Sequence, residues 1–196
     1  MDKLNVAVFF GGKSSEYSVS LESAYSVIRN LNREKYEPVA VGISEKGDWF
    51  YFQGDVEKIK EDTWLNDRDA LPAMLSAGRS EHRLLVFRKA RMSSMPIDAA
   101  FPVLHGKNGE DGTIQGLIEL AGIPLAGCGV LASALCMDKD RAHKLAGLTG
   151  VRVPKACVFR QRSAGEVEAF AEKIGYPLFV KPVKAGSSYG VTKVQG

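Results

Sequence analysis

The 196-residue sequence contains little cysteine and no long apolar run. Its cysteines, Cys128, Cys136 and Cys157, form no C-x-x-C pair, and their odd number does not indicate a disulfide framework. We therefore expect small buried thiols in a reducing compartment. No secretory segment opens the chain, and no apolar run is long enough to span a bilayer. These absences favour a cytoplasmic protein with no membrane partner.

The sequence also lacks a strong excess of charge. It has 26 basic and 23 acidic residues, a formal net charge of +3, and both signs are spread along the chain. This balance argues against a nucleic-acid partner. The densest basic segment, Arg79 to Arg91, encloses the apolar run Leu84 to Phe87, and we interpret it as a strand with solvated flanks. Internal repeats and low-complexity tracts are absent as well.

Hydrophobic residues make up 45% of the chain, which is enough for a sizeable core. Apolar runs typical of buried strands alternate with segments of helical spacing through residue 127. This order predicts an α/β fold built on a Rossmann-like parallel sheet with helices on its faces. The expected strands are Leu4 to Phe10, Pro38 to Ile43, Leu84 to Arg88 and Ala99 to Leu104, with an aromatic hairpin arm at Asp48 to Gln53 and a long helix at Leu131 to Gly150.

The pattern changes after Pro154. A capping box predicts a helix that begins at Ser163, and two strands, Leu178 to Val183 and Val191 to Val194, flank a Gly-Ser loop. We therefore predict an N-terminal α/β domain over residues 1–127 and a smaller α+β domain over residues 128–196. Because the chain stops just after a strand, we expect the second domain to be truncated.

The first candidate site is the loop "FFGGKSSE", where a buried strand enters a helix. Its spacing excludes a P-loop, which needs a glycine where this chain has Ala7, and it excludes the G-x-G-x-x-G dinucleotide fingerprint. A tight turn without a ligand is one interpretation of Gly11 and Gly12. A ligand held by exposed backbone N–H groups is the other.

The second candidate site is the loop "LHGKNGEDG", which follows another buried strand. Glu110 and Asp111 lie where a helix begins, so the helix dipole explains them without a ligand. His105 stands at the carboxyl end of its strand, the edge at which ligands of parallel sheets bind. It is equally compatible with a ligand contact and with a hydrogen-bonded core histidine.

Two lysines mark a third candidate site. Lys139 is flanked by acidic residues on a predicted helix, which is typical of a solvated helix face. Lys181 interrupts an apolar strand, where an unpaired charge is costly, and a Gly-Ser loop follows it. Such a lysine and loop can hold phosphates, although a plain β-hairpin explains the same pattern.

Four stretches in this order and spacing resemble the D-alanine–D-alanine ligase family of ATP-grasp enzymes. They are "FGGKSSEYSVSL", "LHGKNGEDGTIQG", "ASALCMDKDRAHK" and "FVKPVKAGSSYGVTKV". The resemblance runs from Val6 to Val194 and is weakest over residues 45–95. The stretches "EYSVSL" and "DTWL" are similar to the branch that includes D-alanine–D-serine ligases, and Ser18 replaces the acidic residue usual in the family.

The resemblance implies a role for each matching residue. Glu16 resembles the carboxylate that holds the ammonium of the first D-alanine, and His105 the histidine near that substrate's carboxylate. Ser187 resembles the serine that hydrogen-bonds the glutamate and helps to close the site. The ATP-binding residues implied by the resemblance are Lys139, Lys181 and the loop residues Gly186, Ser187, Ser188 and Gly190.

The resemblance also implies a reaction. ATP phosphorylates the carboxylate of D-alanine, and the amine of a second D-amino acid displaces the phosphate, which yields a dipeptide for peptidoglycan precursors. The Mg²⁺ ligands of the family are expected beyond residue 196, so this portion alone is expected to be inactive; the full-length enzyme is expected to be a homodimer. The alternatives are a D-alanine–D-serine ligase, another ATP-grasp ligase such as a biotin carboxylase relative, and an inactive ligand-binding fragment.

Overall fold

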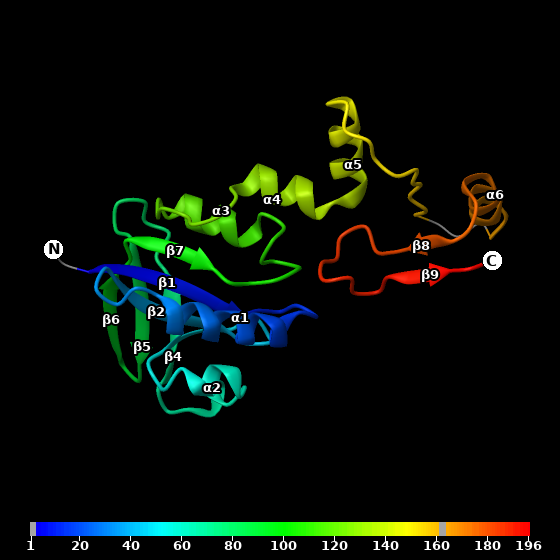
Figure 1. Ribbon diagram of the computed structural model, residues 1–196. Helices are drawn as coiled ribbons and strands as arrows, with labels where there is room; N and C mark the ends of the chain where they lie inside the picture. The colour runs from blue at the N-terminus through cyan, green and yellow to red at the C-terminus, as the bar shows by residue number, and fades with distance from the viewer. Residues whose placement is uncertain (1–2, 161–163) are drawn as a thin grey trace. The chain divides into compact units, whose positions relative to one another are not determined.

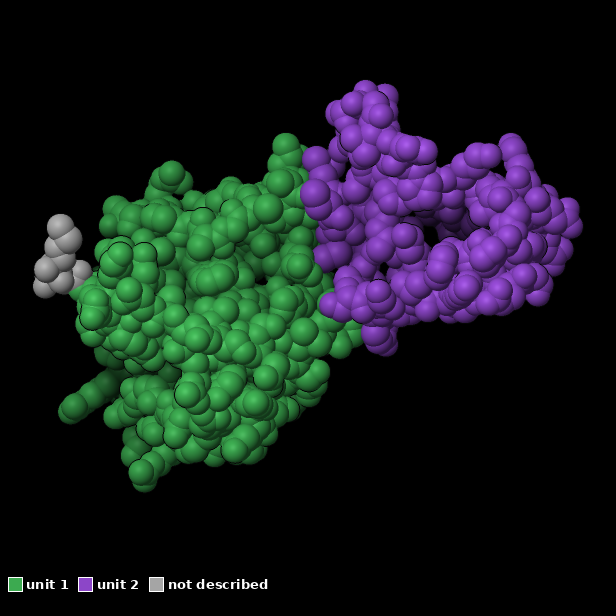
Figure 2. Space-filling model, in the orientation of Figure 1, with its two compact units in different colours: residues 1–133 green, residues 134–196 purple. Residues whose placement is uncertain are grey.

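The computed structural model describes residues 3–160 and 164–196. It divides into two compact units, Met1–Ser133 and Ala134–Gly196 (Figure 2), which are described separately. The functional domains predicted at residues 1–127 and 128–196 stay a prediction. Within the described ranges, no helix is long and apolar enough to cross a membrane.

The first unit is built on one seven-stranded sheet of order β6-β5-β4-β3-β2-β1-β7 (Figure 1). Only the neighbours β2, β1 and β7 pair in parallel, and the other strands form an antiparallel extension. The strands are β1 (Leu4–Gly11), β2 (Tyr36–Ile43), β3 (Trp49–Phe52), β4 (Ala70–Leu75), β5 (Arg83–Arg88), β6 (Arg91–Pro96) and β7 (Ala99–Pro102).

Helices cover both faces of the parallel part of the sheet. Along β1, side chains alternate between the faces, so Val8 packs in the cluster of helix α1 (Tyr17–Asn30) and Phe9 in the cluster of helix α3 (Thr113–Leu120). Both of these β1 residues are fully buried. This double burial explains the continuous apolar run of β1 and confirms the predicted α/β fold.

The predicted alternation of strands and helices does not continue between β2 and β7. The strands β3 to β6 pair antiparallel in sequence order, as a meander. Short connections can join antiparallel strands but cannot join parallel ones. The longest of these connections joins β3 to β4 and contains helix α2 (Glu57–Lys60) and the 3₁₀ turn η1 (Trp64–Asn66).

The predicted long helix from Leu131 to Gly150 is wrong as one element. The structure has α4 (Val130–Met137) and then α5 (Lys139–Leu148). The break falls at Asp138, whose carboxylate accepts a hydrogen bond of 3.1 Å from the backbone N–H of Arg141. Aspartate at a helix start satisfies a free N–H group in this way, so the side chain favours a new helix over continuation.

The second unit also contains helix α6 (Ala164–Ile174) and one antiparallel strand pair, β8 (Leu178–Val180) with β9 (Thr192–Val194). The predicted helix start, Ser163, lies outside the described residues. The three cysteines are free thiols, but all of them are exposed, so the expectation of buried thiols is wrong. Cys128 and Cys157 lie in loops and Cys136 lies on α4.

Candidate functional site

The carboxyl ends of β1 and β7 are tied together by the first turns of α1. Ser20 of α1 accepts a hydrogen bond of 2.9 Å from the backbone N–H of Gly11, and its hydroxyl donates to the carbonyl of Val103. A Cβ at Gly11 would lie 2.3 Å from the carbonyl oxygen of Ile43, and Gly11 has φ +81°. Glycine is therefore needed here for both space and backbone conformation.

Glu16 stands at the N-terminus of α1 and is only 4% exposed. Its Oε1 atom has no hydrogen-bond partner among the described residues. Its Oε2 atom lies against the next loop, where a Cβ added to Gly106 would be 2.1 Å away. A buried carboxylate oxygen without a donor is costly, so this position favours a cationic ligand that can donate to it.

His105 directly precedes Gly106, the residue that lies against this carboxylate. Its Nε2 atom is 3.1 Å from the hydroxyl of Ser23 on α1. Ser23 is seven residues after Glu16, so both project from one face of the helix. The structure thus places His105 beside α1 about two turns after Glu16, and its role toward a substrate stays a prediction. Sequence reasoning missed Ser23.

The loop after β7 is held by its own acidic residues. Glu110 accepts a hydrogen bond of 2.8 Å from the backbone N–H of Gly106, and Asp111 accepts from the backbone N–H groups of Asn108 (2.9 Å) and Thr113 (3.1 Å). Both acids are therefore structural here, as predicted. The amide of Gln115, which sequence reasoning missed, donates to the carbonyl of Gly109 at 2.8 Å.

The Asp111 carboxyl should make the stability of the first unit depend on pH. Burial opposes its ionisation, but the hydrogen bonds from Asn108 and Thr113 outweigh burial and hold its pKa below the usual range. A lowered pKa in the folded state stabilises the fold above the unfolded value of about 3.9. This contribution is lost as the pH falls through the folded pKa.

Asp111→Asn should accordingly destabilise the chain at pH 6, and the difference from wild type should shrink below about pH 4. Urea unfolding midpoints from pH 6 to pH 3 measure this difference. The exposed Asp48→Asn serves as the control, and a difference for Asp111→Asn that does not change with pH would contradict the assignment.

The second unit brings Lys139 to the loop that follows β8. The Lys139 ammonium donates to the carbonyl of Ala185, and its backbone N–H donates to the carbonyl of Val183 at 3.1 Å. Beyond Ala185, Ser187 and Ser188 both have positive φ, +43° and +57°. This conformation is uncommon for non-glycine residues and marks a sharply turned loop.

The Asp138 carboxylate lies near the start of this loop. It forms an ion pair with Arg141, and the Lys184 ammonium lies 4.0 Å from its carboxylate. The backbone hydrogen bond from Arg141 and then its guanidinium hold the pKa of Asp138 below the usual range. Asp138, the N-cap of α5, therefore lies between Arg141 of the helix and Lys184, the residue before Ala185.

Lys181 directly follows β8 and is exposed. The expected strand through Val183 ends at Val180, so the expectation of a charge inside a buried strand is wrong. Glu16 and Ser187 belong to different units, and their predicted proximity stays a prediction. Among residues 3–160 and 164–196, no group of three or more His, Cys, Asp or Glu side chains forms a candidate metal site.

Comparison with known proteins identifies the family. The family model of the D-Ala–D-Ala ligase N-terminus matches residues 5–128, and that of the D-Ala–D-Ala ligase C-terminus matches residues 147–196. The chain therefore belongs to the D-alanine–D-alanine ligase family. The predicted resemblance is confirmed.

The curated relatives include D-alanine–D-alanine ligases and vancomycin resistance proteins. The chain is 46% identical to a D-alanine–D-alanine ligase of Thermoanaerobacter sp. (strain X514), over 99% of this chain and 54% of the relative. It is 44% identical to the vancomycin B-type resistance protein VanB of Enterococcus faecalis, over 99% and 54%. The chain thus spans about half the length of the curated relatives it matches.

Two solved structures of ligases have a similar fold. The VanG D-Ala:D-Ser ligase of Enterococcus faecalis superposes with a TM-score of 0.83 at 48% identity, over 100% of this chain and 56% of that chain. The D-alanine–D-alanine ligase of Coxiella burnetii gives a TM-score of 0.85 at 29% identity, with the same coverage. The α/β unit and the partial ATP-grasp unit are therefore the fold of this family.

Proposed function

We propose that this chain is the first half of an ATP-dependent ligase that joins D-alanine to a second D-amino acid for peptidoglycan synthesis. The γ-phosphoryl group of ATP passes to the D-alanine carboxylate and forms an acyl phosphate. The amine of the second amino acid then attacks the carbonyl carbon and phosphate leaves. The products are the dipeptide, ADP and phosphate.

The observation that carries the proposal is the buried Glu16 carboxylate. One of its oxygens lacks a donor among the residues described, and an α-ammonium group supplies both the charge and the N–H donors that this oxygen lacks. His105, the residue before Gly106, contacts Ser23 of the same helix. In this role it would contact the carboxylate of the same D-alanine.

The second unit would hold the nucleotide. Lys139 and Lys181 would neutralise phosphate oxygens, and the loop residues Gly186, Ser187, Ser188 and Gly190 would cover them with N–H and hydroxyl donors. Ser187 would also hydrogen-bond Glu16 and close the site. The Mg²⁺ ion, which would neutralise charge on the transferring phosphoryl group, finds no ligand cluster among the described residues. Its ligands are proposed to lie in the half of the protein that the relatives have and this chain does not span.

The second substrate has two candidates, D-alanine and D-serine. The 48% identity with a D-Ala:D-Ser ligase structure favours D-serine, and the 46% identity with a named D-alanine–D-alanine ligase favours D-alanine. We propose D-alanine as the first substrate in both cases. The protein is proposed to act in the cytoplasm, as a homodimer.

A full-length protein that carries this sequence would test the proposal. Purified enzyme with ATP, Mg²⁺ and D-alanine should release phosphate and form D-alanyl-D-alanine, whereas L-alanine should give neither product. A second reaction with equal D-alanine and D-serine, analysed by mass spectrometry, would identify the second substrate. Absence of D-alanine-dependent phosphate release from a folded enzyme would overturn the proposal.

Lys181→Met in that enzyme should raise the KM for ATP about tenfold or more, because one charge contact with the phosphates is lost. The exposed position leaves the fold intact. Lys193→Met, on the paired strand β9, is the matched control. An unchanged KM for ATP in Lys181→Met would contradict the assignment of this lysine.

A further inference from the structure

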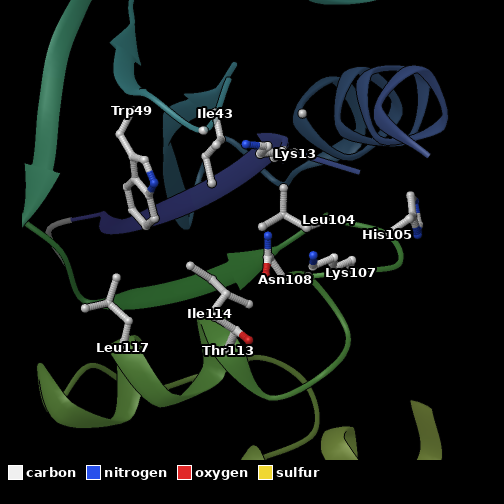
Figure 3. A pocket seen from close by; sticks show the side chains of 14 residues that line it. Lys13, Ile43, Trp49, Leu104, His105, Lys107, Asn108, Thr113, Ile114 and Leu117 are labelled. Carbon is white, nitrogen blue, oxygen red and sulfur yellow. The ribbon is translucent and has the colours of Figure 1, made fainter. Parts of the chain in front are cut away.

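A cavity of about 320 Å³ opens in the first unit at the carboxyl end of the sheet (Figure 3). It lies between the last residue of β2, the first residue of β3 and the N-terminal turns of α3. Its walls are apolar and come from Ile43, Trp49, Leu104, Ile114 and Leu117. This volume is within the range of small-molecule sites.

The cavity is a different place from the Glu16 carboxylate. Glu16 is not among its lining residues, whereas His105 is. Figure 3 shows Trp49 and His105 at opposite ends of the view, with Leu104 between them. The His105 ring is directed to Ser23 of α1, whereas the apolar walls belong to the opposite face of the sheet, in the core cluster of α3.

The charged side chains that line the cavity are both basic. Lys13, from the loop after β1, and Lys107, from the loop after β7, both line the cavity, and none of its lining residues is acidic. Both lysines are exposed, and neither makes an ion pair with any residue that the structure describes. An apolar chamber under two uncompensated ammonium groups fits a ligand with an apolar body and one anionic end.

The walls favour an aromatic body. Trp49 is half-buried, and its ring meets Phe9 edge to face, with ring centroids 5.5 Å apart. The half-buried indole therefore offers further surface to a second ring, and aromatic pairs prefer such offset or edge contacts. The remaining walls are aliphatic and can enclose the ring on its other sides.

We propose that this cavity binds a small aromatic carboxylate, with its ring against Trp49 and its carboxylate at Lys13 and Lys107. The site lies next to the amino-acid site proposed at Glu16 and shares the lining residue His105 with it. A probe of this class is 3-phenylpropionate, whose size predicts a Kd on the order of a few millimolar. Its neutral amide, 3-phenylpropionamide, should bind roughly fivefold more weakly because the two ammonium groups lose their partner.

The two tryptophans provide the measurement. In ¹H–¹⁵N spectra of the 196-residue chain, the indole N–H signal of Trp49 should shift on titration with 3-phenylpropionate. The signal of Trp64, which is fully buried and donates to the hydroxyl of Tyr17, should stay in place and serves as the internal control. Trp49→Phe assigns the two signals.

Variants separate this site from the one at Glu16. The double variant Lys13→Gln, Lys107→Gln should abolish the preference for the carboxylate over the amide, and the exposed Lys35→Gln should not. Glu16→Gln should leave the titration unchanged. The proposal is overturned if 10 mM 3-phenylpropionate leaves Trp49 unshifted, if the amide binds equally well, or if the double variant keeps the preference.

Discussion

Glu16→Gln in the full-length enzyme is expected to lower kcat/KM for D-alanine by about 10²- to 10⁴-fold, because removing one partner of a buried charge pair typically costs about 3–5 kcal/mol. The substitution keeps the size of the side chain and removes its charge. In wild type, one Glu16 oxygen lacks a donor among the described residues. In the variant, a neutral amide would face the ammonium group in place of this carboxylate. Steady-state phosphate release at varied D-alanine measures the loss.

The same substitution should not destabilise the isolated chain. A buried carboxylate without a partner opposes folding, so Glu16→Gln should leave the unfolding midpoint unchanged or raise it. Glu110→Gln is the matched control, since Glu110 is exposed and acts on the backbone N–H of Gly106. If Glu16→Gln lowered the midpoint and kcat/KM together, its role would be structural and the ammonium assignment would be wrong.

The elements around β1 could be predicted because local pattern and tertiary burial agree there. The run from Leu4 to Phe10 is apolar on both faces, and the structure covers both faces with helices. The spacing of Ile114, Leu117 and Ile118 predicts a helix after residue 113, and Gly122 and Pro124 predict its end. α3 spans Thr113–Leu120, in agreement.

Two features could not be predicted because they depend on competing local bonds or on distant partners. The spacing from Leu131 onward suits one helix, but the Asp138 carboxylate captures the N–H of Arg141 and starts a second helix. Between residues 49 and 96 the strands are short, four to six residues each. Their antiparallel pairing is fixed by contacts with neighbouring strands, which periodicity does not report.

The candidate site likewise contains residues that could be predicted from the sequence and residues that could not. Glu16 and His105 could be found because they match motifs of a known family. Ser20, Ser23 and Gln115 could not, because each acts through hydrogen bonds that form only once the loops around it are folded. Serine and glutamine on a helix have no sequence signal that distinguishes such a contact from exposure to solvent.

Trp64 connects the stability of the first unit with the end of α1. It is fully buried, and its ring meets those of Phe10, Phe50 and Phe52 edge to face, with centroids 4.9, 6.0 and 6.2 Å apart. Its indole N–H donates to the hydroxyl of Tyr17 at 3.0 Å. Tyr17, the residue after Glu16, donates in turn to Asp62 at 3.0 Å, and burial raises its pKa well above the usual range.

Trp64→Ala should therefore destabilise the chain by about 3–5 kcal/mol, through lost burial and the cavity left behind. Trp64→Phe keeps most of the ring contacts but removes the hydrogen bond to Tyr17, and should cost less, about 1–2 kcal/mol. Urea unfolding followed by circular dichroism measures both values, with an unchanged m-value expected. Trp49→Ala, at the half-buried ring across the sheet, is the matched control and should cost less than Trp64→Ala. Equal losses for the two alanine variants would contradict the assignment of Trp64 as the centre of the aromatic cluster that positions Tyr17 and the first turn of α1.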